Sequence, residues 1–223
     1  MNQYLTALLK LTPLVIAALF LGGCVTATVQ EVRERATGIV GSETVVVLGR
    51  RSRPSNDETE IDFIRCVADN LGSDRVNVLA EQEFVDATFP WFEPRTAPVN
   101  ANELPALLEE PLLAKRLDQL GLRYVVWVQG KTERVSQSGS MTCGMSPGGA
   151  GCFGFGTWGN DSTYEATIWD FTDRAEVGRV NTSASGQSYM PAVIVPIPII
   201  APVQGTACDG LGDQLLKFLS SEL

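Results

Sequence analysis

The chain of 223 residues contains no histidine at all. Histidine is the usual general base of serine and cysteine hydrolases, and it is the commonest protein ligand of transition metals. The five cysteines include no C-x-x-C pair, which argues against a zinc site built from thiolates. We therefore expect a protein that is not an enzyme and that needs no cofactor and no metal.

Positive charge is also scarce, with 17 Lys and Arg against 26 Asp and Glu. The first 23 residues hold Lys10 and no acidic residue, so the chain without them has 16 basic and 26 acidic side chains and a formal charge of −10. Such an acidic protein is a poor binder of nucleic acid. It also gains no attraction from anionic lipids, so a membrane-bound form needs another kind of anchor.

The sequence has no apolar run long enough to cross a bilayer, which takes about 20 residues. The segment 11–21 is almost wholly apolar and follows a short polar start that carries Lys10. Two small residues, Gly22 and Gly23, come next, and Cys24 follows them. A positive start, an apolar run and small residues before a cleavage point are typical of a secretory signal peptide.

The sequence Leu21-Gly22-Gly23-Cys24 resembles the lipobox of bacterial lipoproteins. The resemblance implies that residues 1–23 are removed as a signal peptide and that Cys24 is acylated, with membrane lipid as its partner. The alternative is a plain signal peptide that ends near a cysteine by chance. Val25 stands where a retention signal would place Asp. By resemblance to the sorting rule of Gram-negative cells, we expect the outer membrane, with the protein facing the periplasm.

Four cysteines remain once Cys24 carries lipid, namely Cys66, Cys143, Cys152 and Cys208. An exported chain meets an oxidising compartment, where an even number of cysteines indicates disulfides. Four cysteines allow three pairings. Cys143 and Cys152 lie nine residues apart in one glycine-rich segment, which makes them the favoured local pair and leaves Cys66 with Cys208.

The pattern of apolar residues predicts a tether over residues 24–42 and a single periplasmic domain over residues 43–223. Short β-branched runs predict strands, and apolar stripes at helical spacing predict helices. Their order is β-α-β-α-α-β-β-β-α, which favours an α/β fold with a mixed sheet, an antiparallel three-stranded meander and helices packed on it. The predicted strands are 44–48, 76–79, 123–135, 162–171 and 175–185. The predicted helices are 57–71, 81–87, 102–120 with an interruption at Pro111, and 207–219.

This element order, with an early strand, an amphipathic helix and the run Leu120-Gly-Leu-Arg-Tyr-Val-Val-Trp-Val128, resembles a periplasmic domain of several envelope proteins. They include the amino-terminal domain of TolB, the curli-secretion lipoprotein CsgG, the flagellar lipoprotein FlgO and the penicillin-binding-protein activator LpoB. The resemblance covers roughly residues 43–220. It implies a binding or accessory lipoprotein. The likeness to curli secretion implies an alternative, a homo-oligomeric subunit of an outer-membrane secretion or assembly complex.

Two stretches depart from that resemblance. Residues 139–159 contain eight glycines with three aromatic residues, and this composition predicts a long loop. The loop is either a flexible hairpin tip without a binding role or a loop that is closed by a disulfide and presents its aromatic residues to a partner. Residues 189–203 contain four prolines and no charge, which predicts extended, polyproline-like structure. That segment is either covered by the sheet or exposed as a partner or membrane surface.

We expect partner binding to use one of these stretches, because the leucine-rich helices need their apolar stripes for the core. The first stretch attaches at the first turn of the meander and the second after its last strand. These points can fall at opposite ends of the sheet, so the two stretches need not form one site. The candidate partner-binding residues are Phe153, Phe155, Trp158, Ile194, Ile197 and Ile199.

Replacing Cys24 with alanine should abolish lipid attachment and normal processing, because the thiol is the atom that receives the lipid. Metabolic labelling with a palmitate analogue measures this directly in Cys24→Ala and in the unmodified chain. Equal label in both would show that the protein is not lipidated at this residue.

Overall fold

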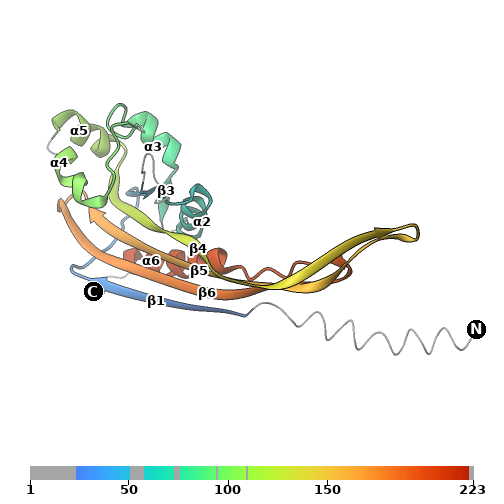
Figure 1. The fold of residues 1–223 in the computed structure, drawn as a ribbon. Coiled ribbons are helices and arrows are strands. Elements are labelled where there is room, and N and C mark those ends of the chain that lie inside the picture. The colour runs from blue at the N-terminus through green and yellow to red at the C-terminus, as the bar shows by residue number, and fades with distance from the viewer. Residues whose placement is uncertain (1–23, 51–57, 73–75, 94, 109, 221–223) are drawn as a thin grey trace, which may run out of the picture. The chain divides into compact units, whose positions relative to one another are not determined.

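The protein folds around a six-stranded sheet with helices packed against it (Figure 1). The computed structural model describes residues 24–220 except for 51–57, 73–75, 94 and 109. The predicted signal peptide therefore lies outside the described residues. Along the chain come β1 Val25–Arg33, β2 Thr44–Gly49, α2 Ile61–Leu71, β3 Asn77–Leu79, α3 Glu81–Ala87, a 3-10 turn Ala101–Glu103, α4 Leu104–Leu108, α5 Pro111–Gln119, β4 Leu122–Ser146, β5 Gly149–Asp170, β6 Ala175–Pro196 and α6 Val203–Ser220.

The sheet combines parallel and antiparallel strands in the order β1-β6-β5-β4-β2-β3. β2 lies between β4 and β3 and runs parallel to both, with Val46 opposite Leu79 and Leu48 opposite Trp127. β4, β5 and β6 follow one another through short connections, which join antiparallel neighbours. The predicted α/β fold with a mixed sheet and an antiparallel meander is confirmed.

The described chain divides into two compact units. The first, here called the core unit, contains residues 26–133 and 161–185 together with the chain from residue 203 onward. The second, here called the hairpin unit, contains residues 134–160 and 186–202 together with the described residues Cys24 and Val25. Strands β4, β5 and β6 contribute residues to both units. The helices α2 to α6 all belong to the core unit.

Helices cover both faces of β2, whose residues are all buried. On one face, Val46 and Leu48 pack in a single apolar cluster with Phe84 of α3, Leu113 of α5 and Trp127 of β4. Because side chains alternate along a strand, the residues between these two point to the other face. That face carries α2 and α6, which pack against each other. The burial of β2 on both faces explains why the predicted run 44–48 is almost wholly β-branched.

The segment after Cys24 is a strand and not the predicted tether. β1 lies at the edge of the sheet beside β6, and the backbone N–H of Glu34 donates to Val177 O at 2.9 Å. The Arg33 guanidinium lies 4.0 Å from the centre of the Phe218 ring in α6 and donates to Phe218 O. The run Val25-Thr-Ala-Thr-Val29 is rich in β-branched residues, which favour a strand over a helix or a coil.

Two predicted helices have different limits. The helix predicted from residue 57 begins at Ile61, with Glu60 at its N-cap, and residue 57 itself lies outside the described residues. The helix predicted over residues 102–120 is two helices, α4 and α5. Proline has no backbone N–H and fits the first turn of a helix, so Pro111 ends the first helix and starts the second.

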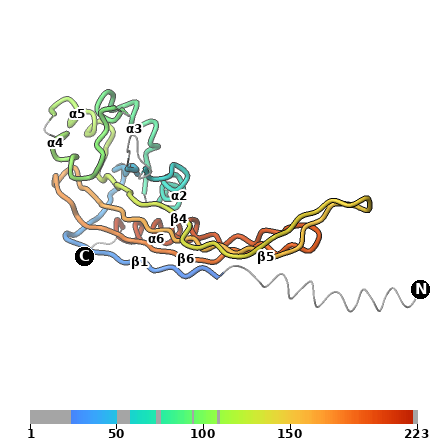
Figure 2. Tube along the Cα trace, viewed as in Figure 1, coloured from blue at the N-terminus to red at the C-terminus, as the bar shows by residue number. Residues whose placement is uncertain are grey.

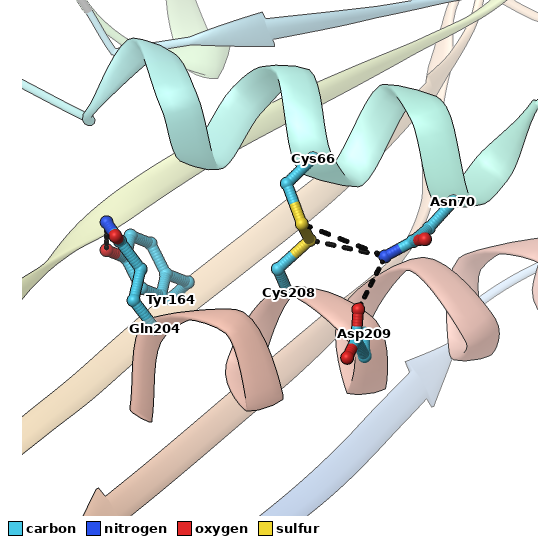
Figure 3. The surroundings of a disulfide bond; sticks show 6 residues. All are labelled: Cys66, Asn70, Tyr164, Gln204, Cys208 and Asp209. Carbon is cyan, nitrogen blue, oxygen red and sulfur yellow. Dashed lines mark hydrogen bonds between the residues drawn. A yellow bond between two sulfur atoms is a disulfide. The ribbon is translucent and has the colours of Figure 1, made fainter. Parts of the chain in front are cut away.

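A disulfide between Cys66 and Cys208 joins α2 to α6, which lie side by side (Figure 3). The Asn70 amide points at this bond and donates to Asp209 Oδ1 at 3.0 Å. A Cβ at Gly212 would lie only 2.5 Å from Asn70 Cβ, so the glycine permits this close approach of the helices. The pairing is the one that the sequence predicts, and the second predicted disulfide, Cys143–Cys152, is also present.

A buried tyrosine connects the same two helices to the sheet. The Tyr164 ring stacks on Phe63 with 3.5 Å between centroids, and its hydroxyl donates to Glu60 Oε2 at 3.0 Å. Gln204 of α6 donates to the same hydroxyl at 3.3 Å. Burial raises the pKa of Tyr164 to about 12. The stability that the neutral phenol contributes is therefore complete below about pH 10 and is lost as the pH rises toward 12.

Removing the α2–α6 disulfide should destabilise the core unit strongly, because the bond joins residues 142 positions apart. The chain-entropy model gives about 4–5 kcal/mol for a loop of this length. The measurement is urea unfolding of Cys66→Ala with Cys208→Ala. The matched control, Cys143→Ala with Cys152→Ala, opens a short loop and should cost about 2–3 kcal/mol. Equal losses in the two double variants would contradict the model.

Candidate interaction surface

The hairpin unit is built from strands where the sequence predicted a loop. β4 continues to Ser146 and β5 begins at Gly149, so the segment 139–159 is a paired hairpin with a tight turn at Pro147 and Gly148 (Figure 2). β6 continues to Pro196, so the first half of the proline-rich segment is also strand. The prediction of a long loop is therefore wrong, and the prediction of polyproline-like structure fails up to Pro196.

Glycines explain why composition indicates a loop and the chain forms a hairpin. Gly139 has φ +116° and Gly154 has φ +149°, backbone conformations that residues with a side chain rarely adopt. A Cβ at Gly139 would overlap the carbonyl oxygen of Phe155, and a Cβ at Gly154 would overlap that of Ser140. Each glycine thus stands where the facing backbone comes too close for any side chain.

Side chains fasten the end of the hairpin. The disulfide Cys143–Cys152 crosses from β4 to β5 with 4.0 Å between the two Cα atoms. The Ser146 hydroxyl donates to Gly149 O at 3.2 Å across the turn. Gly144-Met-Ser146-Pro-Gly148 matches the G-x-S-x-G pattern of hydrolases, but here the serine lies between two strands, whereas that motif requires a strand followed by a helix. The hydrogen bond to Gly149 O gives this serine a role in the turn.

The two unusual stretches form one surface, a point that the sequence left open. The rings of Phe155 and Tyr189 lie 6.1 Å apart, and a Cβ at Gly151 would lie 3.6 Å from Ile194 Cα. The reason is topological. In a meander the first turn and the end of the third strand fall at the same end of the sheet. The extensions of β4, β5 and β6 therefore run together.

After β6 the chain folds back on itself. Tyr189 and Ile199 exchange two backbone hydrogen bonds of 2.9 and 2.7 Å, and Ala201 N donates to Ser188 Oγ at 3.0 Å. Ile199 is half-buried as a result. Ile194 has φ +82°, which is rare for a β-branched residue and costs about 1–3 kcal/mol. This strained residue marks the bend between Pro191 and the returning segment.

The candidate partner-binding residues are mostly exposed. Phe153 is 75% exposed and Phe155 48%, while Ile194 is 69% and Ile197 61% exposed. Trp158 is half-buried, and the Arg134 guanidinium lies 5.9 Å from its ring centre. Of the two alternatives for the proline-rich segment, the exposed one is therefore correct. The surface also includes apolar residues that sequence reasoning missed, namely Val135, Met145, Val193, Val195 and Ile200.

Charge is almost absent from the hairpin unit. Arg134 is the single charged side chain in residues 134–160 and 186–202, and all 26 acidic residues lie elsewhere in the chain. Scattered exposed apolar residues are normal on soluble proteins, but a contiguous apolar patch marks a surface for a partner or a membrane. The depletion of charge over both stretches is the sequence signal from which these additional apolar residues could have been predicted.

The described residues offer little else for metal or membrane chemistry. Among them, one cluster has metal-ligating side chains, Cys66, Cys208 and Asp209, and its two sulfurs are bonded to each other. No helix in the described part of the chain combines the length and apolarity needed to span a bilayer. Cys24 is exposed and is the one cysteine outside the two disulfides.

No protein-family model matches the chain, and no curated protein matches it. Among solved structures, the chain is similar to a PelC dodecamer from Paraburkholderia phytofirmans, with 14% identity and a TM-score of 0.40 over 88% of this chain and 100% of that chain. A variant PelC dodecamer from the same organism gives 12% identity and a TM-score of 0.40, with the same coverage. The case for a function therefore rests on the residues of this chain.

The substitution Gly139→Ala or Gly154→Ala should weaken the pairing of the two hairpin strands, because the new Cβ overlaps the facing backbone. We expect hydrogen exchange over residues 136–158 to rise about tenfold or more, which corresponds to a local loss of at least about 1.4 kcal/mol. The control is Gly144→Ala, since a Cβ there has no neighbour within 4 Å. Equal protection in Gly154→Ala and in the control would show that the two strands are not paired as described.

Proposed function

We propose that this protein is a lipid-anchored, non-enzymatic lipoprotein of the bacterial envelope that binds a protein partner through the apolar surface of the hairpin unit. The lipobox Leu21–Cys24 supports the anchor, and the exposed, unpaired Cys24 fits a residue that is free for acylation. Four other cysteines joined in two disulfides fit an oxidising compartment such as the periplasm. Val25 after the cysteine favours the outer membrane.

The observation that carries the proposal is the chemistry of the hairpin unit. Its exposed residues include Met145 at 88%, Phe153 at 75% and Val193 at 73%, with one charged side chain in residues 134–160 and 186–202. Aromatic and methionine side chains dominate the buried centres of protein interfaces, while Lys, Glu and Asp are depleted there. Strands with a disulfide near their turn hold this surface in a fixed shape, which lowers the entropy lost on binding.

The position of β1 determines how close to the membrane the proposed lipid anchor holds the sheet. Since β1 begins at Val25, an acylated Cys24 is joined directly to the sheet without a flexible tether. Each buried methylene of an acyl chain contributes about 0.8 kcal/mol, and more than one chain makes the anchor stable. In this proposal the edge of the sheet is held next to the membrane, and the acidic surface of the core unit contributes no attraction to it.

A second candidate function is an oligomeric assembly subunit, and one observation favours it. β2 pairs with β4 up to Val128, so residues 134–146 of β4 have β5 on one side and no described strand on the other. An open strand edge with a single charged residue, here Arg134, is a template for pairing with another chain. In this second reading the occupant of the apolar surface is a neighbouring copy of the same protein.

Serine substitutions on the hairpin surface should separate binding from folding. We expect Phe153→Ser with Phe155→Ser to lose most of the partner that crosslinks to the wild-type protein in envelope fractions, because interface aromatics contribute about 1–2 kcal/mol or more each. The same loss is expected for Val193→Ser with Ile197→Ser. The control is Leu112→Ser, which removes an equally exposed apolar residue, 65% exposed, from α5.

Circular dichroism verifies that each variant is folded, and light scattering of the delipidated protein separates the two candidates. A monomer that loses its crosslinked partner supports the accessory protein. An oligomer that dissociates in both double variants, but not in Leu112→Ser, supports the assembly subunit. If folded double variants keep the wild-type partners and the wild-type mass, the hairpin surface is not the binding surface.

A further inference from the structure

The edge strand β1 presents a long stretch of backbone to its outer side. β1 has nine residues and pairs with β6, and no described strand lies on its other side (Figure 1). The residues between its two ends, 26–32, are all exposed. Proteins usually protect such an edge with a proline, a lysine or a very short strand. β1 contains neither residue, whereas the opposite edge strand β3 has only three residues, so β1 is the edge that is open to another strand.

Contacts with α6 hold β1 in place. Gln214 donates to Glu31 Oε2 at 2.6 Å, and the Arg33 guanidinium donates to Phe218 O at 3.1 Å. The two charged side chains of the strand also form an ion pair of 3.6 Å with each other. These contacts engage both charges and leave the backbone of the edge accessible. Because the strand is already ordered, it loses little conformational entropy when another strand pairs with it.

Two observations show which residues of β1 direct their backbone groups to the open edge. The N–H of Glu34, directly after the strand, donates to Val177 O of β6. A Cβ at Gly178 of β6 would overlap Val32 O, so this carbonyl also points to β6. Neighbouring residues of a strand direct these groups to opposite edges. Val29 lies an odd number of positions from both residues, so its N–H and C=O point outward.

The sequence of β1 is complementary to itself in one antiparallel register. A twofold axis at Val29 pairs all nine residues of the strand with the same nine residues of a second copy. Glu31 then faces Ala27 of that copy. Arg33 faces Val25, so no two like charges meet. An axis at Glu31 or Arg33 would instead place like charges opposite each other, and parallel pairing in register would do so at both positions. Backbone direction, paired length and charge therefore favour the axis at Val29.

We propose that β1 pairs with β1 of a second copy of this chain, so that two core units share one continuous sheet. The twofold axis uses the long edge of both copies, and the remaining edge strand of each core unit, β3, is short. The pairing therefore closes at a dimer and does not continue into a fibre. The dimer goes beyond the proposed function and is separate from the partner surface, because Val29 belongs to the core unit and that surface to the hairpin unit.

A single cysteine tests both the pairing and its register. Directly opposite residues of this kind lie about 5.5 Å apart between their Cα atoms, a distance that a disulfide spans. We expect oxidation of envelope fractions to link most of the Val29→Cys protein into a dimer of itself. The control is Val32→Cys. Val32 is 57% exposed, and in this register it lies about 20 Å from the same residue of the second copy, so it should give at least about tenfold less dimer.

Equal dimer from the two cysteine variants overturns the register and the proposal with it. A disulfide that joins Val29→Cys mainly to a different protein also overturns the proposal, because it shows that another chain occupies the edge.

A proline at the same position should prevent the pairing. Val29→Pro removes an N–H that points outward, a change that edge strands tolerate, so circular dichroism should show a folded protein. Two differently tagged copies of the wild-type chain should purify together from solubilised envelope fractions. We expect at least about tenfold less of the second copy when both copies carry Val29→Pro. The control is Phe153→Ser with Phe155→Ser in the hairpin unit, which should keep the wild-type amount.

The same variants separate this inference from the proposed function. Val29→Pro should keep the partner that crosslinks through the hairpin surface, because the substitution lies in the core unit. Wild-type self-association of folded Val29→Pro, or self-association that is lost in the hairpin variant and kept in Val29→Pro, overturns the assignment of the dimer to β1.

Discussion

The burial of β2 on both faces is the constraint on which the rest of the core unit depends. Val45 and Val46 are adjacent in the chain and both fully buried, one toward α2 and α6 and the other toward α3 and α5. A strand in this position needs helical cover on two sides and a parallel neighbour on each edge. Those needs fix where the chain connections to β3 and to β4 diverge.

The sequence-based predictions were accurate where local pattern decides the structure. The runs 44–48 and 124–128 are β-branched and apolar enough to predict strands, and the apolar stripes of the helices place α2 and α6 on the core. The glycine-rich hairpin could not be predicted in the same way. Gly154 fits its site because of Ser140 on the facing strand, and this contact depends on pairing between distant residues and not on composition.

The candidate binding surface shows the same difference between what local composition predicts and what depends on pairing of distant residues. Phe153 and Ile197 were found from their composition, because aromatics and branched aliphatics in uncharged segments indicate a surface for binding. That both belong to one surface required the register of β5 against β6.

The two disulfides differ in when the growing chain is able to form them. Cys143 and Cys152 emerge close together and close a loop of nine residues, which takes far less time to form than a long one. Cys66 has to wait for Cys208, which arrives 142 residues later and within the last helix. Early oxidation of the local pair removes the two thiols that Cys66 would otherwise meet first. The short crosslink in the hairpin therefore protects the long one from mispairing while the chain folds.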